Sequence, residues 1–276
     1  MLLRPIACCL VTVLLVGLSG APLVAAAPAT DDGWMPLFNG KDFTGWYSYL
    51  EGEGRNNDPG HVFTVKDGVI HIYRDVADGK PAPFGYIATD KDYSSYRLRL
   101  EYKWGTKRFA PRATTVRDSG ILYHVGRTDG PSPLWPRSVE CQIQEQDVGD
   151  IFAVGTALTT TVDPKATGTD AHFLEAADGG VQKKIGDNRS VRRVVKSATY
   201  EVPGWNTVEV IVHGDRAAHV VNGKVNNRLH DICDFDPGAP KQPRKLAKGQ
   251  ILLQAEGAEI FYRNVAIKLL GDNDAD

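Results

Sequence analysis

Strict alternation of apolar and polar side chains recurs along the chain and constrains its fold more than any other sequence feature. A period of two residues is that of a β-strand with one face toward a core and the other toward solvent. Further alternating runs follow at residues 207–213, 217–222, 250–256 and 262–269, and helical periodicity is almost absent. The sequence therefore predicts an all-β protein. The clearest run sets Arg97, Arg99, Glu101 and Lys103 against Leu98, Leu100, Tyr102 and Trp104.

Turn residues separate the predicted strands at short intervals. Lys66-Asp67-Gly68, His213-Gly214-Asp215 and Asn222-Gly223-Lys224 are typical of tight hairpin connections. Many short strands at this spacing predict an antiparallel β-sandwich or jelly roll. Long loops in a compact domain often form binding rims. The longest loops are expected at residues 50–60, 105–118 and 163–195.

The first residues have the composition of a secretory leader. Arg4 supplies one positive charge, residues 6–18 are apolar, and Val24-Ala25-Ala26 fits a cleavage site. Residues 1–26 are therefore predicted to be a signal peptide, and the mature protein is expected in the periplasm or outside the cell. No other segment is apolar enough to cross a membrane, so no stable membrane insertion is expected after cleavage.

Charge and cysteine content exclude other classes of partner and scaffold. The formal net charge of −2 argues against nucleic acid as the main partner. Only Cys141 and Cys233 lie beyond the predicted leader, and two cysteines do not make a disulfide framework. Cys141 falls on the apolar side of its predicted strand, so we expect both thiols to be unpaired. No linker or repeat divides the mature chain, which predicts one domain.

Residues 138–145 combine an apolar strand face with an unusually polar one. Glu140, Gln142 and Gln144 fall on the same side of this predicted strand. Carboxylates and amides exchange hydrogen bonds with hydroxyls, and polyols need many such partners. The pattern therefore predicts a carbohydrate site, with an ordinary solvated face as the alternative. The opposite face carries Val139, Cys141 and Ile143.

Eight blocks in sequence order resemble the 3-keto-disaccharide hydrolase domain family. The first is Leu37-Phe38-Asn39-Gly40-Lys41-Asp42-Phe43-Thr44-Gly45-Trp46, and the resemblance extends over residues 34–270. It implies a concanavalin A-like, or laminin-G-like, β-sandwich whose concave sheet binds sugar. Some members of this family cleave glycosides already oxidised to a ketone at C3. The other blocks lie at residues 100–103, 118–121, 139–143, 205–206, 219–223, 253–257 and 262–264.

Two positions depart from the common pattern of that family. Asp118 stands where many members carry Asn before Ser-Gly-Ile. Glu256 stands in Ala255-Glu256-Gly257, where many members have Asp-His-Gly. The second difference puts a carboxylate in place of an imidazole at a position that we expect to face the cleft.

The activity implied by the resemblance depends on the acidity of the C2 proton, which is α to the ketone. A base removes this proton to give an enolate, the C1 leaving group is expelled, and water then adds. Such a site needs a base, a group that stabilises the enolate oxygen, and an acid for the leaving group.

Glu140 is the first candidate for the base or for a metal-binding carboxylate. The alternative is a structural ion pair with Lys103 or with an arginine on a neighbouring strand. His124 is the second catalytic candidate, as acid, electrophile or metal ligand, although a lone strand histidine is more often only hydrogen-bonded. Of the aromatic residues, Trp135 is the best exposed candidate for stacking on a sugar. The substrate-binding candidates are Gln142, Gln254, Glu101, Lys103, Glu256, His219 and Arg263.

Five polar side chains from alternating strands are expected to converge on one concave surface. For the two glutamines in this set a buried amide ladder is the alternative, and Arg263 could equally be structural. The convergent set is Glu101, Lys103, Glu140, Gln142 and Gln254.

The sequence leaves the cofactor and the exact function open. No paired-cysteine or His-x-x-x-His spacing indicates a classical zinc site, but a carboxylate–imidazole–amide cluster could hold one divalent metal ion. The main prediction is an exported hydrolase acting on a carbohydrate substrate. A non-catalytic carbohydrate-binding module on the same fold is the alternative. An adhesion domain of laminin-G type fits less well, because flat protein interfaces are usually poorer in amides and carboxylates.

Overall fold

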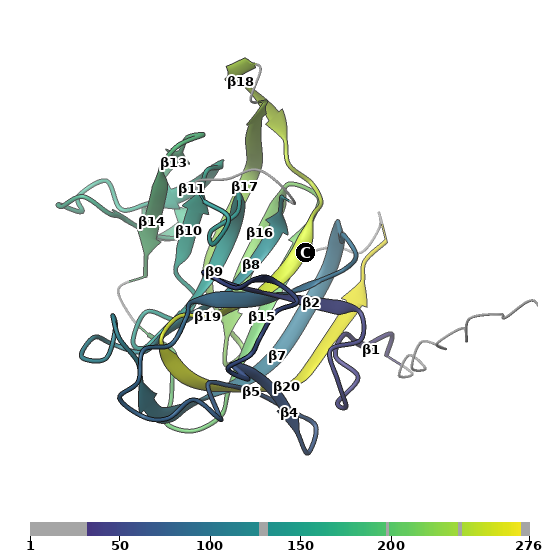
Figure 1. The fold of residues 1–276 in the computed structure, drawn as a ribbon. Helices are drawn as coiled ribbons and strands as arrows, with labels where there is room; N and C mark the ends of the chain where they lie inside the picture. Colours follow the sequence, from purple (N-terminus) through teal and green to yellow (C-terminus); the bar gives the residue numbers. More distant parts are fainter. Residues whose placement is uncertain (1–31, 127–131, 197–198, 237–238, 272–276) are drawn as a thin grey trace, which may run out of the picture.

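The alternating segments form strands that pack as two layered sheets in the computed structural model (Figure 1). The structure describes residues 32–126, 132–196, 199–236 and 239–271. The predicted signal peptide at residues 1–26 lies outside them. Strand pairing is antiparallel except between β12 (Ala171–His172) and β14 (Val191–Val195), which pair in parallel. The chain is therefore the all-β sandwich that the sequence predicted.

The first sheet, called sheet A, contains the longest strands of the described chain. β1 (Met35–Pro36) pairs with β20, and β18 (Ala239–Lys245) pairs with β17. In spatial order its other strands are β13 (Val181–Gly186), β11 (Ala157–Val162), β17 (Lys224–Asp236), β16 (Arg216–Val221), β15 (Asn206–His213), β7 (Ser95–Arg108), β20 (Ala258–Leu269), β5 (Val69–Ile72) and β4 (Phe63–Lys66).

The second sheet, called sheet B, places β8 between β9 and β19, with β12 and β14 at one end. One short 3-10 helix, Ala176–Asp178, lies between β12 and β13. The remaining strands, in spatial order after β14, are β10 (Ile151–Val154), β9 (Ser138–Gln144), β8 (Asp118–Val125), β19 (Gln250–Ala255), β6 (Gly85–Thr89), β2 (Trp46–Leu50) and β3 (Gly54–Arg55).

The apolar faces of the two sheets meet in one core. β7 buries every second side chain, including Leu98, Leu100 and Tyr102, while the residues between them stay partly exposed. From sheet B, the side chains of Val139 and Ile143 fill the same core. Burial of such side chains contributes roughly 1.5–3 kcal/mol each, so this alternation is the main source of fold stability.

A polar contact crosses the core and fixes the strands around β8. The Ser119 hydroxyl donates to the Gln254 carbonyl oxygen at 2.8 Å, and the Tyr262 hydroxyl lies 2.7 Å from Ser119 Oγ. Since the serine proton is used on the carbonyl, Tyr262 is the donor to Ser119. β8 is thereby tied to β19 in its own sheet and to β20 in the facing sheet.

The predicted hairpin turns are confirmed, and one predicted loop is wrong. Lys66-Asp67-Gly68 joins β4 to β5, and Asn222 and Gly223 both have positive φ between β16 and β17. Residues 163–195, expected as a loop, include β12, β13 and β14. β13 is an edge strand whose first four residues are exposed, so it lacks the apolar alternation that marks a half-buried strand.

Cys141 and Cys233 are both free thiols. Cys141 is buried in the core from β9, whereas Cys233 is partly exposed on β17 of the other sheet. No helix in the described ranges is long and apolar enough to span a membrane.

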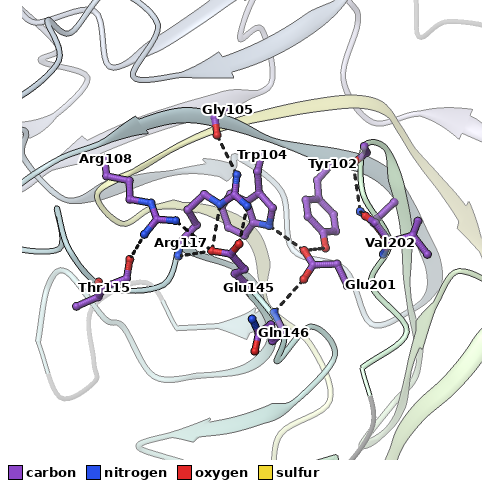
Figure 2. A network of polar contacts seen from close by, with 12 residues as sticks. Tyr102, Trp104, Gly105, Arg108, Thr115, Arg117, Glu145, Gln146, Glu201 and Val202 are labelled. Atoms are coloured by element: carbon purple, nitrogen blue, oxygen red, sulfur yellow. Dashed lines mark hydrogen bonds and ion pairs between the residues drawn. The ribbon is translucent and has the colours of Figure 1, made fainter.

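Glu201 holds one end of the sandwich together through three hydrogen bonds (Figure 2). Its carboxylate accepts from Tyr102 Oη at 2.7 Å, Trp104 Nε1 at 2.8 Å and the Gln146 backbone N–H at 2.9 Å. The three donors come from β7 and from the turn after β9, so one carboxylate joins the two sheets.

Glu201→Ala should lower the free energy of unfolding by about 3 kcal/mol, because three donors lose a charged acceptor. The matched control is Glu53→Ala, since Glu53 is exposed and its carboxylate bonds only to the nearby Asn57 amide. Urea unfolding measures both variants. An effect of Glu201→Ala no larger than that of the control would contradict the assignment.

Candidate functional site

A hollow of about 270 Å³ lies on the face of sheet B that points away from the core. Its apolar wall includes Leu122, Trp135 and Phe152. The polar groups come from β8, β9 and β19 and from the segments next to β8 and β19. They are Arg112, Asp118, Glu140, Gln142, Gln144, Gln254 and Glu256.

The pleat of β9 aims its carboxylate and amides at this hollow. Val139, Cys141 and Ile143 fill the core, so Glu140 and Gln142 project from the other face. Glu140 pairs across the ladder with Phe152 on one side and with Leu122 on the other. The polar face predicted from residues 138–145 therefore lines a cavity and is not an ordinary solvated face.

Gly120 leaves room at the floor of the hollow where a side chain would not fit. A Cβ atom at this position would overlap Glu140 Oε1 and Gln254 Oε1. Those two oxygens reach in from β9 and β19, on either side of β8. The absence of a side chain at Gly120 is thus the condition for their approach.

Hydrogen-bond acceptors in the hollow outnumber the donors available to them. Glu140 makes no hydrogen bond or ion pair in the described part of the chain, although it is only 6% exposed. Gln254 Oε1 and Asp118 Oδ1 are also buried without a partner there. Buried acceptors without donors are costly, and sugar hydroxyls can supply the missing donors.

Arg112 is the cation of the site and binds two carboxylates. Its guanidinium donates through Nη1 to Asp118 Oδ2 and through Nη2 to Glu256 Oε1 at 2.9 Å. Gln144 Nε2 also donates to Asp118 Oδ2, at 2.9 Å. Arg112 is therefore committed to Asp118 and Glu256, and Glu140 has no counter-ion of its own.

Burial shifts the acidity of both glutamates upward. Burial, followed by the nearby charge of Glu256, raises the pKa of Glu140 well above its ordinary value. Burial also raises the pKa of Glu256, to about 7, against the opposing effect of Arg112. A carboxyl whose pKa lies near neutrality, as that of Glu256 does, suits proton transfer.

Backbone contacts behind the hollow position the Arg112–Glu256 pair. The Phe109 N–H donates to the Gly257 carbonyl oxygen at 2.8 Å, and the Arg112 N–H donates to the Phe109 carbonyl oxygen at 2.9 Å. The Gly257 N–H donates to Tyr73 Oη at 3.1 Å, and Tyr73 donates to the Pro83 carbonyl oxygen at 2.9 Å. The loop that carries Arg112 and the turn that carries Glu256 are thus joined directly.

The expected convergence of five side chains is wrong for two of them. Glu101 and Lys103 lie on the outer face of sheet A, whereas Glu140, Gln142 and Gln254 share the hollow on sheet B. Alternation shows which side of a strand a residue occupies, but the same pattern arises in either sheet. No amide-to-amide hydrogen bond joins the two glutamines in the described structure, so the ladder alternative is not formed.

Arg263 also lies outside the hollow, on β20 of sheet A. Its guanidinium donates to Glu101 Oε2 at 2.7 Å, and its Cζ lies 3.9 Å from the centroid of the Trp205 ring. Asn264 donates to the other Glu101 oxygen at 2.8 Å. Glu101 and Arg263 thus form a surface ion pair rather than part of the predicted cluster.

The two candidate histidines are hydrogen-bonded within the fold. A bulge in the pairing of β8 with β19 gives His124 a positive φ, and its Nε2 lies 2.8 Å from the Gly214 carbonyl oxygen of the other sheet. His219 lies between Gly149 O at 2.9 Å and Tyr123 Oη at 3.0 Å. Burial lowers the pKa of each imidazole to about 4, so both are neutral at neutral pH.

Sequence reasoning missed Arg112 and gave Asp118 no role. Arg112 lies in the predicted loop 105–118, where no sequence periodicity indicates which way a side chain points. From the sequence, Asp118 was only a departure from the family pattern. Its position at the start of β8, where it pairs with Gln144, could have indicated that it belongs to the site. Gln144 and Trp135 do line the hollow.

A larger cleft of about 430 Å³ lies beside the Glu201 network and includes Trp104, Arg117 and Glu145. Its carboxylates already accept hydrogen bonds, and Lys103, which also lines the cleft, lies with its Nζ 5.2 Å from the centroid of the Trp205 ring. Arg117 Nη2 donates to Glu145 Oε1 at 2.6 Å, and the Glu201 carboxylate is saturated by its three donors (Figure 2). A cleft with satisfied groups offers less to a ligand, so the hollow with free acceptors is the candidate site.

The metal ion considered from the sequence stays a prediction. Among the described residues, no three or more His, Cys, Asp or Glu side chains are grouped so that they could hold a metal ion.

Comparison with known proteins gives a family match and several likenesses of fold. The model of the 3-keto-alpha-glucoside-1,2-lyase-like domain matches residues 33–268. A search of curated proteins found no match.

Solved structures resemble the chain at low sequence identity. A provisionally assigned glycosyl hydrolase from Parabacteroides distasonis has a TM-score of 0.50 and 23% identity, and the match covers 90% of this chain and 100% of that one. A carbohydrate-binding module from Bacillus subtilis has a TM-score of 0.46 and 11% identity, over 82% of this chain and 97% of that one. At such identities the likeness concerns the fold alone.

Gly120→Ala should leave the protein folded but displace the ends of Glu140 and Gln254, because the new methyl group needs the space of their oxygens. We expect sugar binding, measured by calorimetry, to weaken at least about tenfold, equivalent to about 1.4 kcal/mol. Gly60→Ala is the control, since nothing lies within 4 Å of its Cβ position and its backbone is not in the left-handed region. Equal affinity in Gly120→Ala and wild type would contradict this account of the floor.

Stability should fall as pH rises from about 4.5 to about 7, because Glu256 ionises in the unfolded chain before it ionises in the folded protein. This contribution is fully present below the ordinary pKa of 4.5 and is lost by about pH 7; the shift is equivalent to about 3 kcal/mol. Glu256→Gln removes it, so the variant should gain stability relative to wild type as pH rises. If the free energies of unfolding of the two proteins, measured with urea, change equally with pH, the raised pKa of Glu256 is contradicted.

Proposed function

Because the chain belongs to the 3-keto-alpha-glucoside-1,2-lyase-like domain family, we propose that it cleaves 3-keto glycosides or disaccharides by removing the proton at C2. The family membership connects the protein with carbohydrate chemistry. The observation that carries the specific proposal is the pair of buried glutamates, Glu140 and Glu256, in a hollow rich in unpartnered acceptors. Both have a raised pKa, and one of them has no hydrogen bond or ion pair in the described structure.

The proposed reaction needs two proton transfers in sequence. The C2–H bond breaks, the proton goes to a carboxylate, and the electron pair forms an enolate with the C3 ketone. The C1–O bond then breaks, and its electron pair leaves with the oxygen, which takes a proton from a carboxylic acid. Water adds across C1 and C2 afterwards, so the overall change is hydrolysis.

The residues of the hollow match these requirements. Glu140 and Glu256 are the proton-transfer groups, and Arg112 supplies positive charge for the enolate oxygen. Gln142 and Gln254 offer amide groups to the sugar hydroxyls. Trp135 supplies an apolar wall for the ring face.

Export forms part of the same proposal. The leader predicted at residues 1–26 would deliver the mature protein to the periplasm or the cell exterior, where it would meet oxidised glycosides.

A non-catalytic carbohydrate-binding module is the second candidate, because free acceptors alone suffice to bind sugar. The two functions separate when the purified protein is incubated with a 3-keto disaccharide and released reducing sugar is followed. The enzyme releases it catalytically, whereas a binding module shows affinity and no turnover, with or without added divalent metal.

Glu140→Gln keeps the shape of the side chain but cannot exchange a proton, so turnover should fall by about two to four orders of magnitude. The melting temperature at neutral pH should not fall, because Glu140 forms no ion pair in the described structure and its raised pKa costs the folded protein stability at that pH. Glu101→Gln is the matched control, since Glu101 lies on the outer face of the other sheet and pairs with Arg263. Unchanged turnover in Glu140→Gln would remove this residue from the mechanism.

A further inference from the structure

Two oxygen atoms meet above Gly120 with no visible donor between them. Glu140 Oε1 and Gln254 Oε1 would each overlap a carbon placed at the Cβ position of Gly120, so they are neighbours. Gln254 Oε1 is buried without a hydrogen-bond partner among the described residues, and Gln254 is only 3% exposed. No hydrogen bond contributes to the pKa shift of Glu140. Two acceptors in this position repel one another unless one carries a proton; the alternative is a half-turn of the Gln254 amide, which would present Nε2–H to an ionised Glu140.

Only Glu140 can carry that proton. An amide oxygen is an acceptor, whereas a protonated carboxyl is both a donor and an acceptor. A protonated Glu140 would donate to Gln254 Oε1 and satisfy both groups at once. The geometry therefore favours a neutral carboxylic acid at Glu140 in the resting protein.

Burial and the nearby carboxylate of Glu256 favour the same state, and the smaller effect of Arg112 opposes it. Arg112, the cation lining the hollow, is bound to Asp118 and Glu256. Of these two carboxylates, Glu256 places negative charge near Glu140 from the end of β19. Below β9, the neutral groups of Cys141 and Tyr262 lie in the core and supply no positive charge. Burial and the charge of Glu256 accordingly raise the pKa of Glu140.

The contact with Arg112 makes Glu256 the carboxyl that can be ionised. Its Oε1 accepts from Arg112 Nη2 at 2.9 Å, and a charge-assisted hydrogen bond stabilises the carboxylate. Two carboxyls in one hollow thus have different partners, an amide oxygen for one and a guanidinium for the other. Different partners push the pKa values of two carboxyls apart, so that one can act as an acid and the other as a base.

We propose that Glu140 enters the reaction protonated and acts as the acid, while Glu256 is the base that removes the C2 proton. This assignment rests on the proposed function and reverses the role expected for Glu140 from the sequence. Glu256 takes the proton from C2, and Glu140 gives its proton to the oxygen that leaves C1. When water adds, Glu140 takes a proton from the water as its oxygen bonds to C1, and Glu256 returns the proton to C2. Both carboxyls then regain their starting states.

The resting proton is tested by infrared difference spectroscopy at neutral pH without substrate. The spectrum of wild type minus Glu140→Gln should contain the carbonyl stretch of a protonated carboxylic acid. Glu101→Gln is the control and should remove a carboxylate band, because the hydrogen bonds of Asn264 and Arg263 lower the pKa of Glu101 despite partial burial. A carboxylate band lost in Glu140→Gln would overturn the proposal. If that variant does not fold, pH titration of wild type labelled with ¹³C at the glutamate carboxyls gives the same answer.

The two roles are tested by exchange of the C2 proton of a 3-keto glycoside in D₂O. Glu140→Gln should still exchange this proton while losing release of the leaving group. Glu256→Gln should lose both. Exchange that is retained in Glu256→Gln but lost in Glu140→Gln would overturn the assignment. A wild-type protein that neither exchanges nor cleaves would overturn the proposed function and with it both catalytic roles, whereas the infrared band still decides where the resting proton lies.

Discussion

The pleat of β9 determines where the site lies. Because Val139, Cys141 and Ile143 fill the core between the sheets, Glu140 and Gln142 must leave from the opposite face. A shift of register by one residue would bury the carboxylate in an apolar core and expose the apolar row, so the register is strongly specified. Ser119 and Tyr262 reinforce it from β8 by joining the two sheets.

The same packing that stabilises the fold makes the site chemically unusual. Glu140 and Glu256 are almost fully buried on a sheet face that is otherwise open to ligands. Arg112 forms ion pairs with Asp118 and Glu256, whereas Glu140 feels its charge only at a distance. A buried carboxyl without a counter-ion destabilises the fold when it ionises, and this is the state that a proton-transfer residue must visit. The fold therefore loses stability at the carboxyls that the reaction needs.

Sequence patterns predicted the fold and the central part of the site. Alternation identified β7, β9, β15 and β20, and the polar face of residues 138–145 identified the strand that carries Glu140. Alternation does not specify which sheet a strand joins, so Glu101 and Lys103 were wrongly grouped with Glu140. Arg112 lies in an irregular loop without a strand period, so nothing in the sequence indicated where its side chain points, and it could not be predicted. His124 was misplaced because a bulge, which no local signal revealed, turns its side chain away from the hollow.

Sugar should bind in the hollow on sheet B rather than in the larger cleft beside Glu201. The most direct measurement is a crystal structure of the Glu140→Gln variant soaked with a 3-keto glycoside. The account predicts the oxidised ring above Gly120, with C2 toward Glu256, the C1 oxygen toward residue 140 and hydroxyls donating to Gln254 and Asp118. Sugar bound instead in the cleft lined by Trp104 and Glu201, with the hollow empty, would contradict it.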